Sequence, residues 1–235
     1  MPPTLSAKQA QMKRREEQIL EVARGMLVTD GYHGLNMERI ADEVQASKGT
    51  VYNHFANKEE IIVALAMQSA AIRVDQFRRA AQFRDRPRFR MMAIGFAAER
   101  FAREFADFFL LEQILQLPSV RQKVPDRRQH LIDNSEVQCM SVVAGVVRDA
   151  IAAEDLSLPE HFTPEQLVFG LWALTSGGFA IASSNSLAHI GLEQPYQTIA
   201  DHTAALLDGF GWQPLSPTYD RHEILERIER EVFPS

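Results

Sequence analysis

Three polar residues suited to capping helix N-termini divide the stretch 36–60, and they constrain the fold more than any other feature. Asn36, Ser47 and Asn57 each precede residues with helical spacing, and their side chains can accept hydrogen bonds from the free amides of a first turn. Two short helices are therefore expected, followed by a long helix from Asn57 to about Phe83. Such closely spaced helix starts predict small helices packed on one another.

Helical spacing continues along the rest of the chain, and no run of residues alternates as a strand does. Apolar stripes, proline first turns and glycine ends predict further helices from Pro87 to near Asp107, over 131–153, from Thr163 and from Pro195 to Gly209. The tail carries one more apolar stripe, which consists of Ile224, Leu225, Ile228 and Val232. The pattern predicts an all-α fold.

Composition limits the class of protein without naming its function. The chain has 235 residues, 46% of them hydrophobic and 24% charged, as in soluble globular proteins with one or two domains. Its single cysteine, Cys139, excludes a disulfide framework and indicates a reducing compartment, so a cytoplasmic location is expected. The net charge of -6 means that any binding of nucleic acid must come from a local arrangement.

The second short helix carries hydrogen-bonding side chains nearly all round. Only Val51 must face inward, and Phe55 follows as an anchor. An isolated helix this short is marginal in water, so neighbours must hold it. A helix-turn-helix explains both features, because its first helix braces the second, which enters the major groove. The expected DNA-binding residues are Ser47, Lys48, Gly49, Thr50, Tyr52, Asn53, His54 and, at the start of the next helix, Lys58.

The residues alone leave a second interpretation open, in which three small helices form an ordinary helical subdomain. Residues 1–60 hold eight lysines and arginines but nine acids, so the basic footprint of a DNA-binding domain is absent. A helical small-molecule-binding or interaction protein without DNA function is the alternative to be separated by experiment.

The run Asn36–Val44, then Ser47–Phe55 and Asn57–Ile62, resembles the TetR/AcrR repressors, and so do Ile19–Ala23 and Gly31-Tyr32 before it. The resemblance covers about residues 14–65. It implies a homodimeric, all-helical, ligand-controlled repressor whose recognition helix spans Ser47 to Asn53. The family's usual backbone-contacting tyrosine, histidine and lysine match Tyr52, His54 and Lys58. Asn53 stands where many members carry another residue, so base preference does not carry over.

The resemblance and the helical rhythm together predict four parts. Residues 10–57 form the DNA-binding domain, 58–83 a connecting helix, 84–212 a ligand-sensing and dimerisation domain, and 213–235 an amphipathic tail. Gly177 and Gly178 lie among alanines and allow another helix to approach closely, either in a dimer or within one subunit. Whether the tail packs on its own subunit or on the partner is left open by the sequence.

Aromatic and methionine residues crowd the expected sensing domain. Such side chains suit an adaptable apolar cavity, and they equally suit a plain helical core. The inducer is expected to be small and largely apolar. The expected ligand-binding residues are Met91, Phe101, Phe105, Phe109, His130, Met140, Trp172 and Phe179.

Enzymatic and metal functions lack a supporting motif. No G-x-S-x-G elbow, P-loop or dinucleotide fingerprint is present, and the neighbouring His189, Glu193, Asp201 and His202 have no metal-ligand spacing. We therefore expect no catalytic activity, no metal and no cofactor. The apolar stretch from Leu167 to Ala182 is slightly short for a membrane span, so no membrane partner is expected either.

Seven arginines lie between Arg73 and Arg90. They are expected to be mainly solvated, the alternatives being pairing with nearby acids or attraction of an anionic ligand.

Overall fold

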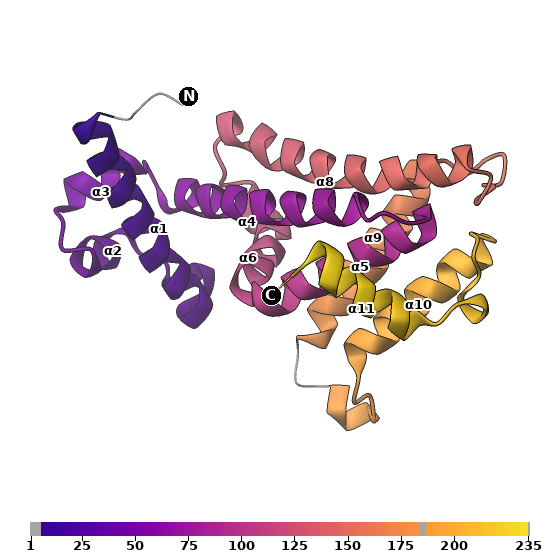
Figure 1. Ribbon diagram of the computed structural model, residues 1–235. Coiled ribbons are helices and arrows are strands. Elements are labelled where there is room, and N and C mark those ends of the chain that lie inside the picture. Colours follow the sequence, from indigo (N-terminus) through magenta and orange to yellow (C-terminus); the bar gives the residue numbers. More distant parts are fainter. Residues whose placement is uncertain (1–5, 184–186, 235) are drawn as a thin grey trace. The chain divides into compact units, whose positions relative to one another are not determined.

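A computed structural model describes residues 6–183 and 187–234 (Figure 1). In these two ranges the regular structure is helical and contains no strand, so the expected all-α fold is confirmed. The helices are α1 (Ala7–Gly34), α2 (Met37–Glu43), α3 (Lys48–His54), α4 (Lys58–Ala81), α5 (Pro87–Glu104), α6 (Ala106–Gln116), α7 (Pro118–Arg121), α8 (Asp126–Ala152), α9 (Pro164–Ala182), α10 (Pro195–Gly209) and α11 (Arg221–Val232), with 3-10 turns at Leu187–Ile190 and Ser216–Thr218.

The chain forms two compact units. The first comprises the described residues of Met1–Ser69 and Asp107–Asp133, and the second those of Ala70–Ala106 and Asn134–Ser235. Helices α4 and α8 each contribute to both units. The four parts predicted from the sequence are defined by function as well as by packing, so their limits stay a prediction.

The helix starts predicted from the sequence are confirmed. Asn36 accepts hydrogen bonds from two amides of α2, Ser47 caps α3, and the Asn57 carboxamide oxygen accepts from the Glu60 amide at 2.9 Å. Thr163 forms a reciprocal capping box at the start of α9. These caps fix where each helix begins and therefore which side chains share a face.

Two helix ends follow local chemistry. Gly31 has a φ of 67°, a left-handed conformation that costs glycine little, and it breaks the regular geometry of α1 just where the Asp30-Gly31 pair predicted an end. The helix expected from Pro87 to near Asp107 ends earlier, at Glu104, because Phe105 leaves helical geometry and α6 begins at Ala106. Helix α6 itself was not foreseen as a separate element.

The core of the second unit is built from α5, α8, α9, α10 and α11. Trp212 and Ile228 are fully buried in this core. Helix α11 buries Ile224, Ile228 and Val232 and packs against α5 of the same chain. Helices α9 and α10 lie side by side (Figure 1).

No helix among the described residues is both long enough and apolar enough to cross a membrane. The apolar stretch from Leu167 to Ala182 lies in α9, which buries Leu167, Val168, Leu171 and Phe179 within the second unit.

Candidate nucleic-acid interface

Helices α2 and α3 form the frame of the candidate interface. Val51 on α3 is fully buried and Phe55 is 3% exposed, so the apolar side of the short helix is anchored in the first unit. Lys48, Gly49, Tyr52 and Asn53 lie at the surface, and Tyr52 exposes half of its area. The predicted division of α3 into one apolar anchor and a polar outer face is therefore present.

Thr50 and Ser47 are joined to each other. Their hydroxyl oxygens lie 2.8 Å apart in a hydrogen bond that either hydroxyl can donate, and the Ser47 oxygen also accepts from the Thr50 amide at 3.1 Å. This pair fixes the first turn of α3 and orients both hydroxyls.

Lys48 begins α3 and forms an ion pair with α2. Its Nζ lies 2.6 Å from Oε1 of Glu38, and both side chains are about 60% exposed. The hydrogen bond to Glu38 is the main cause that raises the pKa of Lys48, and the nearby Asp42 acts in the same direction. The only lysine or arginine of α3 thus has an acidic neighbour.

Lys58 is held against the end of α1. Its Nζ donates to the carbonyl oxygen of Tyr32 at 3.1 Å and lies 4.2 Å from the centre of the Tyr32 ring. Lys123 lies 5.3 Å from the same ring centre. The Tyr32 hydroxyl donates to Glu59 at 2.6 Å, and burial followed by this hydrogen bond raises the pKa of Tyr32 to about 12. The sequence did not single out this cluster.

Two arginines connect α1 with α2. Arg15 donates to the carbonyl oxygen of Val44 at 2.8 Å, and Arg39 pairs with Asp30 at 2.8 Å. The hydrogen bond from Arg39 is the main cause that lowers the pKa of Asp30. Both arginines are therefore engaged within the protein, although a count of basic residues would assign them to DNA binding.

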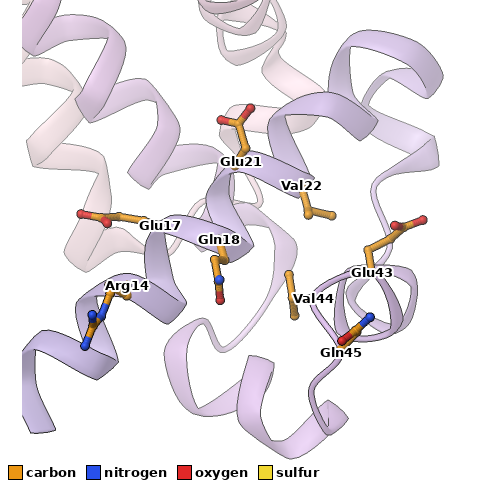
Figure 2. A pocket seen from close by; sticks show the side chains of 8 residues that line it. All are labelled: Arg14, Glu17, Gln18, Glu21, Val22, Glu43, Val44 and Gln45. Atoms are coloured by element: carbon orange, nitrogen blue, oxygen red, sulfur yellow. The ribbon is translucent and has the colours of Figure 1, made fainter.

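A groove of about 710 Å³ lies between α1 and the turn after α2 (Figure 2). Figure 2 shows side chains from both segments along it. Three glutamates and one arginine make it acidic overall, and none of the predicted DNA-binding or ligand-binding residues lines it. The lining residues are Arg14, Glu17, Gln18, Glu21, Val22, Glu43, Val44 and Gln45.

The predicted ligand-binding residues are distributed over both units. Phe109 and His130 belong to the first unit, where Phe109 is buried and His130 exposed. In the second unit, Phe101 and Phe105 stack with ring centres 5.7 Å apart, and Phe179 lies 5.7 Å from Tyr196.

The other three differ in exposure. Met91 is a buried member of the core of the second unit, and Met140 packs partly buried against that core. Trp172 is 37% exposed on α9 and lies beside Phe169, with ring centres 6.4 Å apart. Of the predicted residues, Phe101 and Phe105 stack on each other, whereas Phe179 and Trp172 lie beside aromatic residues outside the predicted set.

Arginines near the start of α5 are engaged by acids. Arg86 pairs with Asp155, Arg90 pairs with Asp149 at 2.7 Å, and the buried Arg88 pairs with Asp208 at 2.7 Å. The expectation of a mainly solvated arginine cluster is wrong for these three, because acids on α8, on α10 and in the loop after α8 lie close enough to neutralise them.

Among the described residues, no group of three or more histidines, cysteines and acids is arranged to hold a metal ion.

Comparison with known proteins supports the N-terminal assignment. Residues 19–65 match the family model for bacterial regulatory proteins of the tetR family. The HTH-type transcriptional repressor AcnR of Corynebacterium diphtheriae is 38% identical over 69 residues, which are 29% of this chain and 35% of that protein. The matched region thus spans about a third of that relative.

Solved structures extend the likeness in fold to most of the chain. A bacterial regulatory protein in the tetR family from Rhodococcus RHA1 superposes with a TM-score of 0.69 at 16% identity, covering 85% of this chain and 98% of that one. AibR in complex with isovaleryl coenzyme A and operator DNA gives 0.61 at 18% identity, covering 84% and 98%. At these identities the likeness shows the fold. Residues 19–65 thus match the tetR family model, and most of the chain shares the fold of solved tetR-family regulators.

Proposed function

We propose that this protein is a ligand-responsive transcriptional repressor that binds palindromic operator DNA as a homodimer. The observation that carries the proposal is α3: a seven-residue helix with one buried anchor, Val51, and an exposed polar face, braced by α2 within the family-matched region. A polar face on a braced short helix suits a major groove, whose base edges offer donors and acceptors.

The polar side chains of the candidate interface divide by the contacts they suit. Asn53 and Thr50 carry groups that can hydrogen-bond base edges, so we assign the reading of sequence to them. Tyr52, His54 and Lys48 suit phosphate oxygens, which position a protein on DNA without reading sequence. Lys58 is assigned to phosphate as well, although it must then keep or exchange its contact with Tyr32.

Helix α9 supports the homodimer. Phe169, Ala173, Gly177 and Ile181 recur every four residues on its exposed side, and Phe169 and Ile181 expose 60% and 58% of their area. The residues between them, Ala173 and Gly177, are small and exposed, so a second helix can approach closely. An apolar stripe of this size on a soluble protein marks an interaction surface, and a second copy of the chain is the partner that a two-fold operator requires.

The ligand is proposed to be largely apolar and to bind in the second unit near Phe101 and Phe105. Their stacked rings lie where α5 gives way to α6, so a ligand there would act on the helix break. A solved relative in fold, AibR, carries both isovaleryl coenzyme A and operator DNA in one structure. The ligand would release DNA by binding better to the conformation with unsuitable spacing of the two recognition helices, and only by that difference in affinity.

The direct test is footprinting of the purified protein on the DNA upstream of its own gene. We expect two protected half-sites related by two-fold symmetry and about 34 Å, or a multiple of it, apart. A single asymmetric half-site would contradict the homodimer, and no protection at low salt would contradict the DNA-binding function.

A further inference from the structure

The ion pair between Lys48 and Glu38 joins the two helices of the candidate interface. Lys48 is the only lysine or arginine on α3, and its ammonium lies 2.6 Å from the Glu38 carboxylate. Both side chains are about 60% exposed, so the pair lies at the surface where α3 would approach DNA. The partner of this lysine in the free protein is thus an acid of the same module.

A second acid reinforces this arrangement. Asp42 lies one helical turn after Glu38 on α2 and also interacts electrostatically with Lys48. The remaining titratable or hydroxyl side chain acting on Lys48 is Tyr52, on α3 itself. Lys48 therefore faces two carboxylates from the neighbouring helix and no competing cation among these groups.

A carboxylate oxygen and a phosphate oxygen make the same kind of contact with a lysine ammonium. Both accept a charge-assisted hydrogen bond at about 2.7–2.9 Å, so one excludes the other from the same N–H. We propose that Glu38 is an internal competitor for DNA phosphate at Lys48 and thereby weakens the electrostatic part of DNA binding. The inference rests on the proposed DNA-binding function and adds a positioning residue to it.

The charge balance of residues 1–60 makes competition at Lys48 important for DNA binding. Residues 1–60 contain eight lysines and arginines against nine acids, and Arg15 and Arg39 are engaged within the module. Few cations remain to attract phosphate, so the state of Lys48 matters for binding to any DNA sequence. Since non-specific binding is chiefly electrostatic, random-sequence DNA isolates this effect from base reading.

The test is a mutant cycle read on a random-sequence duplex across a salt series. Glu38→Gln keeps the shape of the side chain and removes its charge. We expect it to tighten binding about two- to five-fold, the range of an exposed ion pair, and to steepen the salt slope by about 1 as Lys48 gains a phosphate. In a Lys48→Gln background the same change should have little effect.

Glu43→Gln is the matched control, because Glu43 lies on the same helix, is exposed and carries the same charge, but lines the groove after α2. Equal tightening by Glu38→Gln and Glu43→Gln would overturn the proposal, since overall charge would then explain both. Persistence of the Glu38→Gln effect without Lys48 would overturn it as well.

A measurement without DNA checks the pair in solution. We expect the Lys48 side chain, followed by NMR during a pH titration, to lose its proton at lower pH in Glu38→Gln than in the wild type. An unchanged titration would overturn the competition while leaving the proposed function standing. If the wild type binds neither operator nor random DNA at low salt, the proposed function itself fails. If the wild type does bind DNA and only the Glu38→Gln effect is missing, the competition alone fails.

Discussion

Arg88 and Lys48 are both cations paired with a carboxylate, yet their surroundings differ. Arg88 is 2% exposed and donates from one nitrogen to Asp208, to the carbonyl oxygen of Ala204 and to Ser216. Lys48 has a single acid at 2.6 Å and remains 59% exposed. The first pair cannot be exchanged without unfolding its surroundings, whereas water or an external anion can reach the second. The Arg88 pair is thus part of the buried structure of the second unit, whereas Lys48 is accessible from solvent.

The exposed faces of α3 and α9 also differ, in the hydrogen bonds that their side chains can offer. Helix α3 presents Tyr52, Asn53 and Lys48, which offer hydrogen bonds, whereas α9 presents Phe169 and Ile181, which offer none from their side chains. A polar face suits base edges and phosphates, and an apolar face suits another protein surface. The two faces therefore suit partners of different chemistry, as the proposed function requires.

The largest expected effect comes from breaking the buried pair. Arg88→Ala removes the cation and leaves Asp208 without its main partner, so we expect the free energy of unfolding to fall by about 3 kcal/mol. Denaturant titration measures the loss. Arg84→Ala is the control, because Arg84 is exposed beside the same helix start, and a change within about 0.5 kcal/mol is expected there. Equally small losses of unfolding free energy in both variants would show that the buried Arg88 pair contributes no more to stability than an exposed arginine does.

The next effect sharpens the contrast between the two faces. Phe169→Asp places a charge on the apolar stripe of α9, and we expect self-association to weaken by about 2 kcal/mol, roughly 30-fold, because that charge would be buried without a partner in the dimer. Light scattering over a concentration series measures it. Val137→Asp adds the same charge at another exposed apolar site, on α8, and should leave association unchanged. Unchanged association of Phe169→Asp would show that α9 is not the interface.

A smaller effect concerns the Tyr32 cluster in the first unit. Tyr32→Phe removes the hydrogen bond to Glu59 and should cost about 0.5–1.5 kcal/mol of stability at pH 8. The pKa of Tyr32 is raised to about 12 in the folded protein from an ordinary 10.0, so its stabilisation is complete below pH 10 and is lost as the pH rises towards 12. Unfolding of both proteins over this pH range should show the difference shrinking, and a constant difference would contradict the assigned hydrogen bond.

Local chemistry made much of the fold predictable. Asn36, Ser47 and Asn57 cap the helices they were expected to cap, because a capping bond spans only two or three residues. The resemblance to a known family then predicts that α3 is the recognition helix, and this stays a prediction. Pairings across the sequence were not predictable in this way: Lys58 reaches Tyr32, 26 residues away, and Arg88 reaches Asp208, 120 residues away.

The predicted ligand-binding residues show the same limit. Aromatic content identified Phe101 and Phe105, which do stack, but it does not distinguish a pocket wall from a core or from an exposed side chain such as Trp172. Helix α6 was missed because the break at Phe105 has no proline or glycine to mark it. The spacing of residues along the chain predicts helices, but only the packed structure shows which residues each helix contacts.

The most direct test of the account is the effect of Asn53→Ala on operator and random-sequence DNA, measured side by side at one salt concentration. Asn53 is exposed on α3 and carries no charge, so its loss should spare the electrostatic attraction to any duplex. We expect operator binding to weaken by about 1–3 kcal/mol and random binding to stay within about twofold. Equal losses on both duplexes would contradict the central claim that α3 reads sequence through its polar face.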